Sequence, residues 1–231
     1  MLSLALMSTL NIADILAETT LTEHRGFLPG PVGALETIVT SNTNSMATPG
    51  NRLGIICHPH PLYQGTMRNK VVSTIAKAMH NQDMPTIRFN YRGVAESAGS
   101  YDNTIGETAD LLAIVTQVQQ VFPDAKLWLA GFSFGAYIAA KAAAKLESQH
   151  IVEQLITVAP AVNKVDFTDI GNISCRWSTI IGTADEIVPY ADVVAWHDSL
   201  RANKELIAVQ DCSHFFHGKL SELMRVIPIC K

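Results

Sequence analysis

The sequence has few charged residues and no excess of positive ones. Asp, Glu, Lys and Arg together make up 16% of the 231 residues, and the formal net charge is −4. A nucleic-acid-binding protein would show a basic excess or a basic stripe. The chain also has no run of five or six like charges that would form a charged tail. We therefore expect small-molecule partners and no nucleic acid.

Cysteine is scarce, and long apolar runs are missing. The four cysteines have no C-x-x-C spacing and lie far apart, at Cys57, Cys175, Cys212 and Cys230. This spacing predicts neither a disulfide framework nor a zinc site. The longest uncharged stretch around Ser133 runs from Leu127 to Ala140, which is shorter than the roughly 20 residues of a membrane span. We expect a cytoplasmic protein with reduced thiols and no membrane partner.

The first 19 residues are apolar and differ in pattern from the rest. They contain no positive charge, since the first one in the chain is Arg25, and this argues against a secretory signal. Asn11, Asp14 and Glu18 recur at helical spacing and predict an amphipathic helix. We predict an N-terminal extension or helix over residues 1–19 and a single domain over residues 20–231. The apolar extension also suggests a homodimer contact.

Short apolar segments alternate with helical patterns from about residue 35 onward. Residues 24–40 predict an antiparallel hairpin with Pro and Gly at its turn. Apolar stripes over residues 111–122 and 220–227 predict helices. Buried strands are predicted at residues 52–59, 84–91, 126–132, 154–160, 176–182 and 205–210. The alternation predicts an α/β protein with a mostly parallel sheet and helices on both faces.

The segment KLWLAGFSFGAYIAAKAAAK places Ser133 between Gly131 and Gly135. Gly-x-Ser-x-Gly alone is a weak signal, but here it follows a predicted strand and precedes a predicted helix. That context is the one a nucleophile elbow requires, because the turn is too tight for side chains at the two glycine positions. The helix N-terminus behind Ser133 supplies positive partial charge where an oxyanion would form. Ser133 is therefore the predicted nucleophile.

A serine hydroxyl needs a base to remove its proton. In a nucleophile-elbow protein of this kind the acid and then the histidine follow the serine in the chain. The histidines after Ser133 are His150, His197, His214 and His217. We favour His214, which stands just after the last predicted strand and just before the last predicted helix. His217 is the alternative, with helix capping as its structural role.

Asp185 is the predicted acid, in the segment STIIGTADEIVPY that follows the next-to-last strand. A carboxylate in this loop can orient the imidazole through its Nδ1–H group. Asp166 and Asp169, in a polar loop earlier in the chain, are the weaker candidates. Glu186 is adjacent to Asp185 and is expected to point the other way.

An oxyanion hole completes the predicted site. Its first donor is the backbone N–H of the residue after the nucleophile, Phe134. The second donor should come from the segment HPHPLY. Its prolines have no N–H, so we predict the backbone N–H of His60 as the donor, with that of Leu62 as the alternative. His58 and His60 also raise the question of a metal. Without a nearby Cys or carboxylate they are poor ligands, so we predict no metal site.

With these residues in view, the chain resembles the α/β-hydrolase family, in particular a bacterial group of small, lidless members. Matching stretches, which span about residues 27 to 220, include LPGPVGALE, HPHPLYQGTMRNKVV, RFNYRGVAESAGSYD, GFSFGAY, GTADEIVP and SHFFHGKL. The resemblance implies an α/β-hydrolase fold with a sheet of about eight strands and a triad of Ser133, Asp185 and His214. The segment APAVNKVDFTDIGNISCR is too short to form a lid domain.

We predict a serine esterase that cleaves small carboxylic esters through an acyl-enzyme and needs no cofactor. An open site without a lid suits small, soluble esters. The predicted loops place several residues near enough to line an acyl pocket: Leu62, Tyr63, Met67, Phe134, Ile187, Val188, Phe215 and Phe216. The alternatives are another acyl-transfer enzyme with the same triad (a thioesterase, peptidase or acyltransferase) and a catalytically silent binding protein.

Overall fold

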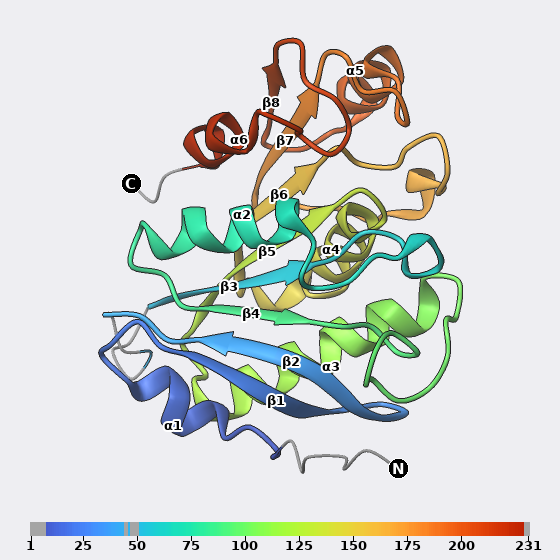
Figure 1. Ribbon diagram of the computed structural model, residues 1–231. Coiled ribbons are helices and arrows are strands. Elements are labelled where there is room, and N and C mark those ends of the chain that lie inside the picture. The colour runs from blue at the N-terminus through green and yellow to red at the C-terminus, as the bar shows by residue number, and fades with distance from the viewer. Residues whose placement is uncertain (1–7, 44–45, 47–50, 229–231) are drawn as a thin grey trace.

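A sheet of eight strands runs through the structure, a computed structural model that describes residues 8–43, 46 and 51–228 (Figure 1). Residues 1–7 of the predicted extension and Cys230 lie outside these ranges. The strands are β1 (Glu23–Gly30), β2 (Gly33–Thr40), β3 (Arg52–Cys57), β4 (Thr86–Phe89), β5 (Lys126–Phe132), β6 (Val152–Val158), β7 (Arg176–Gly182) and β8 (Lys204–Val209).

The strands follow the order β1-β2-β4-β3-β5-β6-β7-β8. β1 and β2 form the predicted hairpin, β2 pairs antiparallel with β4, and every later pairing is parallel. Parallel strands need crossover connections that cover both faces of a sheet, which explains why β5 and β7 are almost continuously buried. The predicted mostly parallel sheet is confirmed. β8 was predicted as a buried strand and is instead half-buried, because it forms the edge of the sheet.

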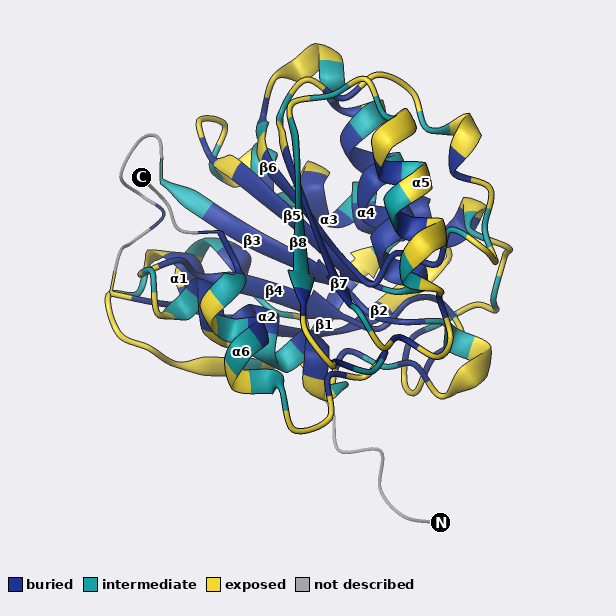
Figure 2. Ribbon diagram, turned by 90° about the horizontal axis from the view of Figure 1, so that it is seen from above, coloured by how far each residue is buried: buried dark blue, intermediate teal, exposed yellow. Residues whose placement is uncertain are grey.

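The described residues also form six α-helices and three short 3₁₀ turns, and all of these except α1 and α6 lie between strands. The helices are α1 (Ile12–Ala17), α2 (Lys70–His80), α3 (Ile105–Val121), α4 (Phe134–Lys145), α5 (Tyr190–Ser199) and α6 (Leu220–Val226). The 3₁₀ turns are η1 (Pro61–Tyr63), η2 (Glu147–Gln149) and η3 (Phe167–Asp169). Figure 2 shows α3, α4 and α5 on one side of the sheet and α2 and α6 on the other. Helices on both faces are therefore confirmed.

Helix α1 lies within the predicted N-terminal extension and packs on β2 and α3. Asn11 caps it by accepting the N–H groups of Ala13 and Asp14, and its apolar side, with Ile15 and Leu16, is buried in the core of the same chain. The apolar side of this helix is thus covered within the chain. The domain boundary at residue 20 and the homodimer contact stay predictions.

The connection from β6 to β7, residues 159–175, contains no regular element except η3, so no lid domain stands between these strands. In the part of the chain that the structure describes, no helix is long and apolar enough to cross a membrane. The three described cysteines, Cys57, Cys175 and Cys212, are free thiols.

Candidate active site

The turn from β5 into α4 holds Ser133 in a strained backbone conformation. Its φ of 55° and ψ of −115° lie in a region that side-chain-bearing residues rarely adopt. A Cβ on Gly131 would lie 2.0 Å from the carbonyl oxygen of Gly135, and a Cβ on Gly135 would lie 2.4 Å from that of Cys57. Only glycine fits at these two positions, so the tight turn accounts for the two glycines of the sequence motif.

Ser133, His214 and Asp185 come together at the carboxyl ends of three parallel strands. The imidazole Nε2 of His214 lies 3.1 Å from Ser133 Oγ, and its Nδ1 lies 2.8 Å from Asp185 Oδ2. The three side chains follow β5, β7 and β8, whose carboxyl ends meet at one edge of the sheet, where open α/β sheets carry their ligands. The geometry therefore contains an unbroken hydrogen-bond chain from hydroxyl to imidazole to carboxylate.

Asp185 and His214 are both held from several sides. Asp185 Oδ1 accepts the backbone N–H groups of Ile187 (2.9 Å) and Val188 (2.7 Å), so Oδ2 remains for the imidazole. The backbone N–H of His214 donates to Glu186 Oε2 at 3.1 Å. Since an aspartate accepts from Nδ1–H, the Nε2 atom is left as the acceptor for the Ser133 hydroxyl. Both Asp185 and His214 are buried, which shields this pair from water.

The loop after β3 carries His58 and His60, and the His60 ring centroid lies 4.7 Å from that of Phe134, the residue after Ser133. Burial lowers the pKa of His58 to about 3, so the ring is neutral; it contacts the Pro59 carbonyl through Nδ1 and accepts the Tyr91 N–H through Nε2. His58 thus ties the loop to the core and is no base. Phe134 is the first residue of α4, a position whose backbone N–H has no acceptor within its own helix. The role of the Phe134 and His60 N–H groups as oxyanion donors stays a prediction.

A cavity of about 920 Å³ opens beside Ser133. The predicted residues that line it are His60, Tyr63, Ser133, Phe134, Ile187, Val188, His214 and Phe215. Three predicted pocket residues lie elsewhere. Met67 is fully buried and its N–H donates to Asn90, Leu62 is 66% exposed outside the cavity, and Phe216 is buried in the core.

The weaker acid candidates have other partners. Asp166 caps η3 by accepting the N–H and hydroxyl of Thr168. Asp169 accepts the Tyr137 hydroxyl at 2.8 Å and pairs with Lys141 at 2.5 Å. Neither carboxylate contacts a histidine, so the structure brings only Asp185 to the imidazole.

The alternative base also lies apart from Ser133. His217 is exposed and stacks on Phe215, with ring centroids 5.9 Å apart. Among the described residues, no group of three or more His, Cys, Asp or Glu side chains is placed to hold a metal ion.

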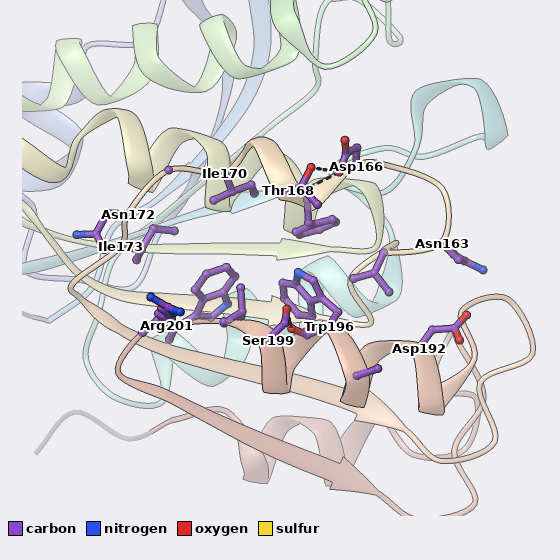
Figure 3. Close-up of a pocket in the computed structure, with 17 residues that line it drawn as sticks. Asn163, Asp166, Thr168, Ile170, Asn172, Ile173, Asp192, Trp196, Ser199 and Arg201 are labelled. Carbon is purple, nitrogen blue, oxygen red and sulfur yellow. Dashed lines mark hydrogen bonds between the residues drawn. The ribbon is translucent and has the colours of Figure 1, made fainter.

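A second cavity, of about 770 Å³, lies between α5 and the β6–β7 connection (Figure 3). Trp196 and Ser199 of α5 face Ile170 and Thr168 across it, with the hydrogen-bonded Asp166 at its rim (Figure 3). Of the residues predicted for catalysis it contains only Asp166, one of the weaker acid candidates, and neither Ser133 nor a predicted base lines it. Ser133 and His214 line the other cavity.

Several residues around Ser133 and His214 were given no part in the site by the sequence analysis, which expected Glu186 to point away. Glu186 anchors the backbone of His214, and the loop before α3 brings Tyr101, Asn103 and Thr104 to the cavity wall. Glu186 stands in the stretch GTADEIVP and Tyr101 in RFNYRGVAESAGSYD, but neither stretch by itself shows that these side chains reach the site. The contact of Tyr101 with His60, in the loop after β3, follows from the placement of β4 next to β3 in the sheet, which chain order alone does not give.

Comparison with known proteins identifies relatives that cover most of this chain. A family model described as "Serine aminopeptidase, S33" matches residues 67–177. An α/β serine hydrolase homologue from Coxiella burnetii is 42% identical, with a TM-score of 0.81 over 90% of this chain and 96% of its own. An α/β serine hydrolase without a lid from Xanthomonas campestris is 37% identical, with a TM-score of 0.78 over 90% and 97%. An uncharacterized protein of Rickettsia prowazekii is 31% identical over 87% of this chain and 85% of its own.

Proposed function

The chain belongs to the α/β serine hydrolase family, and on this basis we propose that it hydrolyses small carboxylic esters through an acyl-enzyme. The observation that carries the proposal is the hydrogen-bond chain from Ser133 through His214 to Asp185 at the wall of a large cavity. A hydroxyl in contact with an oriented imidazole is an activated nucleophile. The cytoplasmic location expected from the sequence stays a prediction.

In the first half-reaction, Ser133 Oγ attacks the ester carbonyl while His214 Nε2 takes the hydroxyl proton. Asp185 holds the ring in the tautomer that leaves Nε2 free, and its negative charge stabilises the imidazolium. The developing oxyanion is held by the backbone N–H groups of Phe134 and His60. Each such donor contributes about 3 kcal/mol of transition-state stabilisation.

Collapse of the tetrahedral intermediate expels the alcohol, which receives its proton from His214. Water then enters, gives a proton to the same imidazole and attacks the acyl-enzyme, so that the acid leaves and Ser133 is restored. No cofactor takes part in these steps. The open cavity and the short β6–β7 connection favour small, soluble esters over long-chain lipids.

Hydrolysis of a peptide bond is the second candidate, because the matched family model is described as a serine aminopeptidase. An aminopeptidase needs a carboxylate that binds the free amino group of its substrate. The two aspartates that line the cavity, Asp166 and Asp169, already have partners within the chain. We therefore favour ester hydrolysis over peptide hydrolysis.

A substrate panel tests the proposal. Purified protein is assayed with p-nitrophenyl esters from acetate to decanoate and with alanine p-nitroanilide, alongside Ser133→Ala. We expect hydrolysis of the short esters, declining with chain length, and no release from the anilide, with all activity lost in the variant. If the anilide is hydrolysed as fast as the esters, peptide hydrolysis becomes the favoured function.

A further inference from the structure

Tyr101 lies on the cavity wall beside the loop that carries His60. It belongs to the connection between β4 and α3 and lines the same cavity as Ser133. Its hydroxyl lies 3.3 Å from His60 Nε2, and its ring centroid lies 5.2 Å from that of His60 and 6.1 Å from that of Phe134. The catalytic scheme above gives this hydroxyl no task.

The hydrogen bonds of His60 determine whether the Tyr101 hydroxyl acts as donor or acceptor toward the His60 ring. His60 Nδ1 accepts the backbone N–H of Leu62 at 3.2 Å. Burial lowers the pKa of His60, so the ring is neutral and carries its one proton on Nε2. That N–H donates to the Tyr101 oxygen. The Tyr101 proton then has no acceptor within the described part of the chain, and burial, which raises the pKa of this phenol, keeps the proton in place.

The loop that carries Tyr101 is held rigidly. The carboxylate of Glu107, fully buried at the start of α3, accepts the N–H groups of Asp102 and Thr104, each at 2.8 Å. Asn103 and Thr104 have positive φ angles of 46° and 78°. A β-branched residue adopts such a conformation only when its surroundings enforce it. The Tyr101 donor is therefore preorganised and needs no rearrangement to meet a ligand.

The cavity lining is apolar beside His214 and polar beside Tyr101. Ile187 and Val188 donate their backbone N–H groups to Asp185, the partner of His214, and the Phe215 ring centroid lies 5.1 Å from that of His214. Asn103 and Thr104, which also line the cavity, follow Tyr101 in its loop. Because His214 must give its proton to the departing alcohol, the alcohol half of the ester lies on the apolar side. The acyl half extends toward the polar side.

We propose that the Tyr101 hydroxyl donates a hydrogen bond to an oxygen in the acyl half of the ester other than the carbonyl oxygen. The hydroxyl contacts the far edge of the His60 ring rather than its backbone N–H, which sets it apart from the oxyanion position. The substrate class is then esters of hydroxy, alkoxy or keto acids with apolar alcohols. This inference rests on the proposed ester hydrolysis and goes beyond it by naming the acyl group.

A matched pair of substrates tests the role of Tyr101. p-Nitrophenyl methoxyacetate and p-nitrophenyl butyrate have acyl chains of equal length, and only the first carries an acceptor oxygen. We expect Tyr101→Phe to lower kcat/KM for methoxyacetate about tenfold, as for the loss of one hydrogen bond, and for butyrate less than about twofold. Tyr190→Phe, at the start of α5 and outside the cavity, leaves the ratio of the two values unchanged.

A second measurement needs no variant. In the wild type, the ratio of kcat/KM for methoxyacetate to that for butyrate should exceed the ratio of their hydroxide-catalysed rates about tenfold. Equal losses for both esters in Tyr101→Phe, or a wild-type ratio equal to the hydroxide ratio, would overturn the assignment while leaving ester hydrolysis intact. A wild type that hydrolyses neither ester would instead refute the proposed function itself.

Discussion

Asp185 uses both of its carboxylate oxygens, and each has a separate task. Oδ2 takes the Nδ1–H of His214, and Oδ1 takes the N–H groups of Ile187 and Val188. The two backbone hydrogen bonds to Oδ1 fix the direction in which Oδ2 faces His214. Orientation of the imidazole thus depends on one side chain whose own position is set by the backbone that follows it.

Replacement of Asp185 by Asn tests this division of tasks. The amide keeps an oxygen for the two backbone donors but presents an NH₂ group to His214 Nδ1, which forces the proton to Nε2 and removes the acceptor that Ser133 needs. We expect kcat for p-nitrophenyl acetate to fall about 10³- to 10⁴-fold. Asp124→Asn, at an exposed position before β5, provides the matched control. A loss smaller than about tenfold in Asp185→Asn would contradict the assigned role.

The elbow between β5 and α4 depends on the absence of two side chains. A Cβ on Gly135 would approach the carbonyl oxygens of Cys57 and His58 at 2.4 and 2.5 Å, and these are backbone atoms of a central strand and its following loop. We expect Gly135→Ala to lower the free energy of unfolding by about 3 kcal/mol or more, as overpacked cores do. Urea denaturation measures this change in the free energy of unfolding.

Gly171 supplies the control for the elbow variant. The nearest atom to a Cβ at Gly171 is the Ala144 Cβ at 3.6 Å, an ordinary van der Waals distance. Gly171→Ala should therefore shift the free energy of unfolding by less than about 1 kcal/mol. Equal destabilisation by the two substitutions would mean that the close approach at Gly135 does not shape the elbow.

At the scale of the whole molecule, buried neutral histidines make folding sensitive to acid. Burial lowers the pKa of His58 to about 3, and burial together with Arg88 lowers that of His80 to about 4. In the unfolded chain both rings titrate near pH 6.5. Below that pH the unfolded state binds protons that the folded state does not, so stability falls as the pH decreases.

We expect the free energy of unfolding to drop by about 2 to 3 kcal/mol per pH unit between pH 6 and pH 4.5, from about 1.4 kcal/mol for each of the two histidines. Urea denaturation at a series of pH values measures the slope, and His80→Gln should reduce it by about half. A free energy of unfolding that stays constant over this range would show that these rings are protonated in the folded state.

Much of the fold could be predicted from the pattern of the sequence. The hairpin, the strands of the sheet and the elbow follow from periodicity, turn residues and the glycines around Ser133. The sheet order could not be predicted, because β4 inserts between β2 and β3 and chain order does not encode that placement. Tyr101 was missed for this reason, since its contact with His60 joins loops that only the sheet order brings together.

Proximity in sequence to His60 also did not predict correctly which residues line the cavity. Met67 and Leu62 stand in the loop region after β3, as His60 does, yet Met67 turns into the core and Leu62 turns to solvent. The bond from the Met67 N–H to Asn90 and the 3₁₀ turn η1 set these directions. Neither is visible in a stretch of sequence read by itself.

The most direct test of the central claim is covalent labelling of the wild type with a fluorophosphonate probe, followed by mass spectrometry of the modified peptide. An assembled hydrogen-bond chain predicts stoichiometric labelling at Ser133 alone and none in Ser133→Ala. Folded protein that remains unlabelled, or that is labelled at another residue, would contradict the claim that Ser133 is an activated nucleophile.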